Sequence, residues 1–350
     1  MTKIPILLYH SVSVDPPGWI ADLTVTPRAF SDQMDLIVAS GRTPVTVSAL
    51  RTALEGETVL PRRPVVVTFD DGFADFAAAA VTLADRRIPS TLYVTTGALA
   101  GRGPKPANMV LPPAAMLNWS QLADLEDHGV EIGGHTHTHP QLDTLGRREA
   151  AVEIRHCKQL LEDEIGHEIG SFAYPYGYSS ASVRRSVEAA GYRSACAVMN
   201  ALSSGSDRAF SLARLMVHAS TTPGEVAAWL DETGAATAPY PERMRTRAWR
   251  AYRRLRSTDV ARRVTGTGAP EQPGMSEEAA SYAVLGVGID ALGVPADWDE
   301  LSDIARTNGL ALVEDAACAA GGTYRGRACG SSSPSLDWCC DTAASRRPAR

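Results

Sequence analysis

The chain has 350 residues, of which 44% are hydrophobic and 21% charged, and its formal net charge is −6. This composition is that of a soluble globular protein, and the length suits two domains or one barrel with an appendage. The acidic balance argues against nucleic acid as a partner, and no run of about 18 apolar residues indicates a membrane span. The apolar run near the N-terminus is too short for a signal peptide, so a cytoplasmic location is expected.

Short apolar runs alternate with helical patterns along residues 4–232. The runs are typical of buried parallel strands, which we expect at residues 4–8, 64–69, 90–95, 130–133, 171–174, 192–198 and 211–217. Helices are expected at residues 27–40, 75–86, from 120 onward, 147–165, 181–190 and 223–232. Thr26 and Ser120 are the predicted caps of two of them. Residues 97–118, rich in Gly, Pro and Asn, should form a long loop.

Strands that alternate with helices predict parallel pairing with right-handed crossovers. The fold is therefore either a (β/α) barrel or an open doubly wound sheet. No G-x-G-x-x-G motif follows the first strand, which argues against the dinucleotide-binding version of the open sheet.

Polar clusters follow the predicted strands at the point where each strand ends. They are Tyr9-His10, Asp70-Asp71-Gly72, the three histidines between residues 135 and 139, and Tyr174-Pro175-Tyr176-Gly177. The carboxyl ends of parallel strands share one rim, and active sites form there. We therefore expect these four clusters to meet at one mouth.

Two of these clusters predict a catalytic metal site. His135 and His139 are four residues apart, so both imidazoles can face the same way, and Asp71 would complete a set of three ligands. Three protein ligands leave positions free for water and substrate, as in catalytic sites. Asp70 beside them could accept a proton from water. His137 alternates away from the ligands, and we expect it to be structural.

The segments Thr-Phe-Asp-Asp-Gly (68–72) and His-Thr-His-Thr-His (135–139) resemble the first two motifs of the polysaccharide deacetylase family, the NodB-homology domain. The resemblance covers about residues 3–235. It implies a distorted (β/α) barrel of about seven parallel strands that removes N-acetyl or O-acetyl groups from sugars. It also implies Asp70 as general base and Asp71, His135 and His139 as ligands of zinc, with cobalt, nickel, iron or manganese as alternatives.

Other parts of the chain resemble the family less closely. The arginine that begins the third motif is replaced by Ala173, and Arg214 is a candidate to supply its charge; the fourth motif is not recognisable. The resemblance assigns oxyanion binding to the main-chain N–H near Tyr176 and leaves His218 as the candidate general acid. The opening Ile-Pro-Ile-Leu-Leu-Tyr-His-Ser-Val and residues 172–177 resemble the branch that acts on exopolysaccharides and other surface glycans.

Further residues are candidates for substrate binding. Tyr174 and Pro175 lie in the third motif, and His10 ends the first strand; His10 could equally be a packed histidine of the rim. Trp119 could stack on a sugar ring or simply pack in the core.

The C-terminal third of the chain differs in composition. After a deacetylase domain at residues 1–235, we expect a basic helix and linker at 236–281, in which Arg243–Arg256 either packs on the barrel or contacts a membrane or anionic glycan. Residues 282–330 resemble a fragment of the sugar aminotransferases that use pyridoxal phosphate, with Asp315 at the position that pairs with the cofactor ring. That chemistry needs a lysine, and none follows Lys158, so a non-catalytic appendage is expected. Residues 331–350 should be a disordered tail.

The sequence thus predicts a metal-dependent carbohydrate deacetylase whose partner is an acetylated glycan. Two rival hypotheses stay open. A non-haem iron oxygenase also uses two histidines and a carboxylate, but the alternation of strands and helices argues against it. A glycan-binding module that kept the metal and lost activity is consistent with Ala173 and the missing fourth motif.

Overall fold

The computed structural model describes residues 2–240 and four two-residue strands beyond them. The chain divides into two compact units, Met1–Thr265 and Gly266–Arg350. In the second unit, β14 (Leu285–Gly286) pairs in parallel with β15 (Leu312–Val313), and β16 (Thr323–Tyr324) pairs antiparallel with β17 (Arg327–Ala328). The predicted basic helix and the tail lie outside the described residues. No helix of the described part of the chain has the length and apolar character needed to cross a bilayer.

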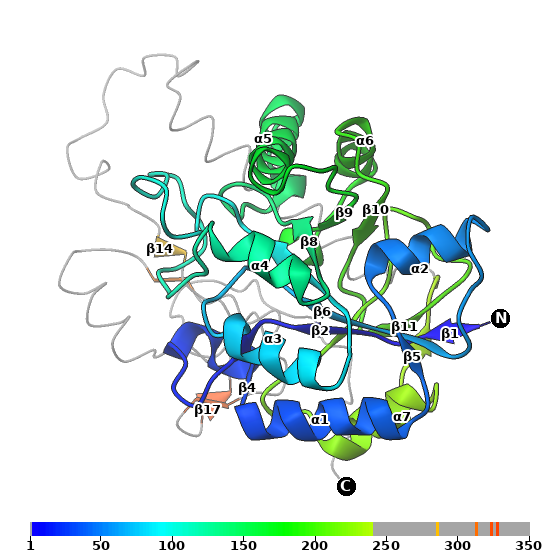
Figure 1. Ribbon diagram of the computed structural model, residues 1–350. Coiled ribbons are helices and arrows are strands. Elements are labelled where there is room, and N and C mark those ends of the chain that lie inside the picture. Colours follow the sequence, from blue (N-terminus) through cyan, green and yellow to red (C-terminus); the bar gives the residue numbers. More distant parts are fainter. Residues whose placement is uncertain (1, 241–284, 287–311, 314–322, 325–326, 329–350) are drawn as a thin grey trace, which may run out of the picture. The chain divides into compact units, whose positions relative to one another are not determined.

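The first unit is built on one parallel sheet in the order β10-β9-β8-β7-β6-β2-β12 (Figure 1). Its seven strands are β2 (Ile6–Tyr9), β6 (Pro64–Phe69), β7 (Ser90–Val94), β8 (Val130–Gly134), β9 (Ser171–Ala173), β10 (Ser194–Cys196) and β12 (Leu215–Met216). The short strand β5 (Thr43–Pro44) also pairs with β6. The predicted distorted barrel with about seven parallel strands is confirmed. Strand β6 has the predicted bounds, and all six of its residues are buried, as a strand covered on both faces requires.

One continuous segment joins the two edges of this sheet. Leu212 exchanges main-chain hydrogen bonds with β10, through Ala195 and Ala197, and three residues later Leu215 pairs with Leu7 of β2. The chain between these two contacts holds Arg214, whose side chain is completely buried. Closure of the curled sheet therefore places this arginine inside the barrel.

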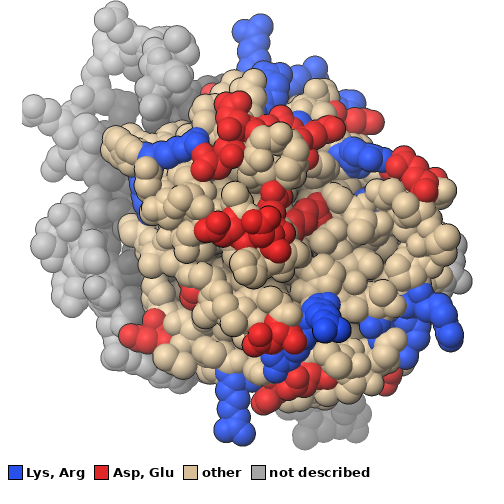
Figure 2. Space-filling model, in the orientation of Figure 1, with Lys and Arg blue, Asp and Glu red and all other residues tan. Residues whose placement is uncertain are grey.

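Seven α-helices of the described residues surround the sheet. They are α1 (Pro27–Ala39), α2 (Val47–Leu54), α3 (Phe76–Asp85), α4 (Gln121–Asp127), α5 (Arg147–Ile165), α6 (Ala181–Ala189) and α7 (Pro223–Leu230). Thr26 caps α1 through its hydroxyl, as predicted, whereas the side chain of Ser120 makes no capping bond to α4. Figure 2 shows acidic side chains gathered over the outer surface near α4, so this layer faces solvent.

Several small elements were absent from the sequence prediction. They include α2 and a separate three-stranded sheet in which β11 (Ala201–Ser204) pairs antiparallel with β1 (Lys3–Ile4) and parallel with β13 (Ala236–Thr237). Strands β3 (Ser11–Val12) and β4 (Thr24–Val25) flank the 3-10 helix η1 (Gly18–Leu23). Two further 3-10 helices are η2 (Leu142–Thr144) and η3 (Pro175–Gly177).

Candidate metal and hydrolytic site

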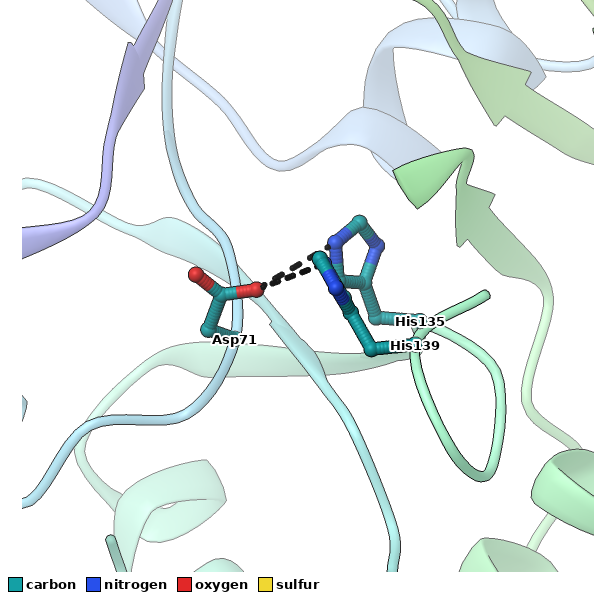
Figure 3. Close-up of side chains that lie close together, drawn as sticks. All are labelled: Asp71, His135 and His139. Carbon is teal, nitrogen blue, oxygen red and sulfur yellow. Dashed lines mark ion pairs between the residues drawn. The ribbon is translucent and has the colours of Figure 1, made fainter. Parts of the chain in front are cut away.

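The described part of the chain holds one set of three side chains placed to bind a metal ion, Asp71, His135 and His139. Their ligand atoms all lie within 4.8 Å of one another. Asp71 Oδ1 is 3.1 Å from His139 Nε2 and 3.5 Å from His135 Nε2. Figure 3 shows the Asp71 carboxylate approaching from one strand end and both imidazoles from a single loop. The structure thus brings together the three side chains that the sequence analysis predicted as a set of ligands.

The atoms of this set suit a cation. Asp71 Oδ1 is buried and has no hydrogen-bond donor among the described residues, so its charge lacks a partner of that kind. His135 Nδ1 lies 2.8 Å from the main-chain oxygen of Ala173, which directs the other ring nitrogen, Nε2, to the carboxylate. Burial lowers the pKa of His135 to about 4, against the opposing effect of Asp70, so this imidazole is neutral at pH 7 and can bind a metal.

The backbone is unusual where these ligands leave their strands. Four residues that are not glycine have positive φ angles here: Asp71 (77°), Thr136 (68°), His139 (63°) and Tyr176 (58°). Such conformations cost on the order of 1 kcal/mol or more each and cluster at functional sites. The positive φ of Asp71 also aims its side chain differently from that of its neighbour Asp70.

The strand before the histidines is shaped to admit them. A Cβ on Gly133 would lie 2.5 Å from the ring of Tyr93, and one on Gly134 would collide with the hydroxyl of Tyr192. These two tyrosines are completely or almost completely buried. The Gly-Gly pair therefore lets β8 pass between two aromatic rings before His135 enters the site.

Arg214 holds Asp70 in a two-bond ion pair. Its Nη1 donates to Oδ1 at 2.6 Å and its Nη2 to Oδ2 at 2.7 Å, and its other donors reach Thr68 and the oxygen of Ala197. Burial alone would raise the pKa of Asp70, but the charges of Arg214 and His135 bring it below the usual value. Asp70 is thus an ionised carboxylate with a fixed orientation, and Arg214 supplies the charge that position 173 lacks.

Glu153 of α5 fixes the loop that carries the two histidines. Its carboxylate accepts hydrogen bonds from the main-chain N–H groups of His137 and Thr138, at 2.9 and 2.8 Å, and from the Thr138 hydroxyl at 2.7 Å. The sequence analysis did not identify this residue. A glutamate on a long helix carries no local signal that it reaches a loop about fifteen residues earlier.

The remaining candidates occupy different environments. His10 is adjacent to the site, because Asp70 N–H donates to the oxygen of Tyr9 at 3.0 Å. His218 is half-buried, and its main-chain N–H donates to the hydroxyl of Thr221 at the start of α7.

The aromatic candidates also separate into two groups. Tyr176 is 46% exposed, and its ring centroid lies 4.9 Å from that of His139. Tyr174 is fully buried and donates to the oxygen of Phe210, and Pro175 is buried beside it. Trp119 is only 4% exposed, and its ring lies beneath the Arg102 guanidinium at 4.2 Å. Of the two roles considered for Trp119, this environment favours packing over stacking on a sugar.

Comparisons with known proteins agree with this geometry. Residues 58–195 match the model of the polysaccharide deacetylase family, and residues 278–335 match that of the DegT/DnrJ/EryC1/StrS aminotransferase family. A curated relative is YxkH of Bacillus subtilis (strain 168), whose name assigns it to the polysaccharide deacetylases. It is 23% identical over 192 residues, and the match covers 55% of this chain and 63% of YxkH, less than two thirds of its length.

Solved structures share the fold. The Streptococcus pyogenes deacetylase PplD, determined in complex with acetate, is 24% identical with a TM-score of 0.56; the match covers 64% of this chain and 96% of PplD. IcaB from Ammonifex degensii is 22% identical with a TM-score of 0.54, over 66% of this chain and 97% of IcaB. Residues 58–195 are thus similar to the polysaccharide deacetylase family, and the solved structures share the fold of the N-terminal unit.

Proposed function

We propose that the chain is a metal-dependent hydrolase that removes N-acetyl or O-acetyl groups from a polysaccharide or surface glycan. The observation that carries this proposal is that two adjacent buried carboxylates have different partners. Both oxygens of Asp70 are bonded to Arg214, and Oδ2 lies 3.9 Å from His135 Nε2, whereas Asp71 Oδ1 faces His135 and His139 and accepts no bond from an arginine of the described residues. One carboxylate is therefore available as a base and the other as a ligand.

The ligand set fits a divalent ion that accepts nitrogen and oxygen donors. Zinc prefers two histidines and a carboxylate in open catalytic sites, and cobalt, nickel, iron or manganese accept the same donors. When bound, such an ion lowers the pKa of water from 15.7 to roughly 7 and polarises a carbonyl oxygen. Asp71, His135 and His139 would hold it, and the Ala173 oxygen and Glu153 would keep the imidazoles oriented.

Asp70 accepts the proton of the attacking water in this proposal. Its lowered pKa keeps it ionised at neutral pH, and its two bonds to Arg214 hold the carboxylate in one orientation. The main-chain N–H of Tyr176, at the rim beside His139, would stabilise the negative charge that develops on the acetyl oxygen.

His10 is our candidate to protonate the leaving amine or alcohol, in preference to His218. His10 follows Tyr9, whose oxygen binds the N–H of Asp70. Burial lowers the pKa of its ring, and the nearby carboxylates of Asp71 and Asp70 oppose this effect. His218 instead lies near Thr221 and Glu225. If His10 donates the proton, His10→Gln lowers kcat at least a hundredfold and His218→Gln changes it little; the opposite ranking would assign the role to His218.

The test of the proposed function is acetate release from a panel of N-acetylated and O-acetylated oligosaccharides, with metal analysis of the same preparation. We expect release that disappears on chelation and returns with added zinc. Binding of the same oligosaccharides without any acetate release would favour the glycan-binding module instead. The arginine at position 214 already removes one ground for that alternative, because the charge missing at Ala173 is present.

A further inference from the structure

Exposed apolar side chains gather around the mouth of the barrel. The described residues include nine large hydrophobic side chains that are exposed, and four of them lie on loops that follow the carboxyl ends of strands: Val14, Trp19, Val110 and Tyr176. Single exposed hydrophobic residues are normal on a protein surface. Two of these four have a ring contact that links them to the buried polar site: Tyr176 lies beside His139, and Trp19 lies beside Phe73.

Trp19 is the largest of the four, and it is held in place. It lies in η1 and is 42% exposed, and its ring packs against that of Phe73 with centroids 5.9 Å apart and an interplanar angle of 53°. Phe73 follows Asp70-Asp71-Gly72 directly. The tryptophan ring is therefore one aromatic side chain away from the segment that carries the base and a ligand.

Two contacts anchor the segment that carries Trp19. Ile20 is buried in a small core with Phe73, Leu111 and Met116, and the main-chain N–H of Ala219 donates to the oxygen of Asp22 at 2.9 Å. An aromatic ring that is packed against a neighbour and is still partly exposed needs little ordering when a ligand stacks on it. Trp119, by contrast, is covered by Arg102.

We propose that Trp19 is a stacking platform for the sugar unit next to the one that loses its acetyl group. This inference rests on the proposed deacetylase function. Pyranose rings present apolar C–H faces that complement an aromatic ring, and they carry hydroxyl groups at their edges that stay in water. Tyr176, the exposed aromatic residue beside His139, would flank the sugar whose acetyl group reacts.

The test compares kcat/KM for acetate release from β-1,4-linked N-acetylglucosamine oligomers of one to five sugars. We expect Trp19→Ala to lower kcat/KM for the five-sugar oligomer about tenfold, mainly through KM, and to lower it less for the single sugar. Val59→Ser is the matched control, since Val59 is 91% exposed and lies between α2 and β6, at the opposite end of the strands. An unchanged dependence on oligomer length in Trp19→Ala would overturn the proposal.

Two further measurements keep the outcomes separate. If Trp19→Ala does not fold, Trp19→Phe keeps an aromatic ring against Phe73 and should lose about threefold on the long oligomer; equal activity to the wild type would count against the platform. If the wild type releases no acetate from these oligomers or from the panel of N-acetylated and O-acetylated oligosaccharides, the deacetylase proposal fails on its own. Calorimetric binding of the five-sugar oligomer then tests the platform, and Trp19→Ala must weaken it.

Discussion

Charged side chains are buried at both ends of the barrel, but their partners differ. At the amino ends of the strands, Arg42 donates to two main-chain oxygens and to Glu232, and Lys158 donates to the oxygen of Ile169 and to Glu162. At the carboxyl ends, Asp71 Oδ1 and one ring nitrogen each of His10 and His139 are buried without a hydrogen-bond partner in the described structure.

The buried charges at the amino end have partners that favour stability, whereas an unpaired buried oxygen at the carboxyl end points to function. Buried ionised groups are normally bonded, because an unsatisfied one costs several kcal/mol. At the amino end the buried charges have ion-pair partners, as Arg51 does in Glu55; the unpaired buried atoms there are Arg51 Nε and the hydroxyls of Ser90, Ser171 and Ser194. The carboxyl end departs from it at Asp71 Oδ1, which faces Nε2 of both His135 and His139, and a bound cation would supply the missing partner of this oxygen.

The largest effect on stability should come from breaking the one fully bonded ion pair at the mouth. Arg214→Leu leaves Asp70 as an uncompensated buried charge, so we expect the free energy of unfolding to fall by about 3–5 kcal/mol in urea titrations. Arg42→Leu should cost less, about 1–3 kcal/mol, because its partner Glu232 is 33% exposed and stays partly hydrated. Equal losses for the two variants would show that the two ends do not differ in this way.

A smaller effect, on metal affinity, is expected at Glu153, which fixes the loop that carries His135 and His139. Glu153→Ala removes the acceptor of three hydrogen bonds and should weaken metal binding by about 10- to 100-fold, measured by competition with a chelator. Glu153→Gln keeps one acceptor oxygen and should recover part of the affinity. Asp163→Asn, an exposed position on the same helix, is the control. Metal affinity unchanged in Glu153→Ala would mean that the loop holds its shape without this carboxylate.

The smallest effect belongs to a surface pair far from the mouth. The hydrogen bond to Glu126 raises the pKa of His167, so its stabilising contribution is complete below the unfolded pKa of about 6.5 and is lost as the pH rises through the higher folded value. Because the histidine side chain is 58% exposed, His167→Gln should cost only about 0.5 kcal/mol at pH 5 and nothing at pH 9. In the Glu126→Gln background most of this pH dependence should disappear, since Glu126 is the largest cause of the raised pKa; an unchanged pH dependence would assign it to another group.

Much of the barrel could be predicted because its strands carry strong local signals. The valine run before Asp70 predicted β6 with its observed bounds, and the spacing of His135 and His139 predicted two ligands on one loop. Helix α2 and the strands β11 and β13 were missed, since they are short, and both strands pair with segments far away in the sequence.

The supporting contacts of the site could not be predicted in the same way. Arg214 reaches Asp70 across 144 positions of sequence, and only closure of the barrel brings them together. The sequence analysis named Arg214 only as a source of positive charge, and nothing in the sequence indicated that it would bond to both oxygens of Asp70. The sequence analysis named Trp119 and not Trp19 as a residue that could stack on a sugar; Trp119 is only 4% exposed, whereas Trp19 is 42% exposed.

The central claim is that two neighbouring aspartates have different tasks, and one pair of variants tests it most directly. Acetate release and bound zinc should be measured together in Asp70→Asn and Asp71→Asn. We expect Asp70→Asn to keep its zinc while its turnover falls by about 10²–10⁴-fold, and Asp71→Asn to lose the zinc itself. Normal turnover in Asp70→Asn, or wild-type zinc content in Asp71→Asn, would contradict the account.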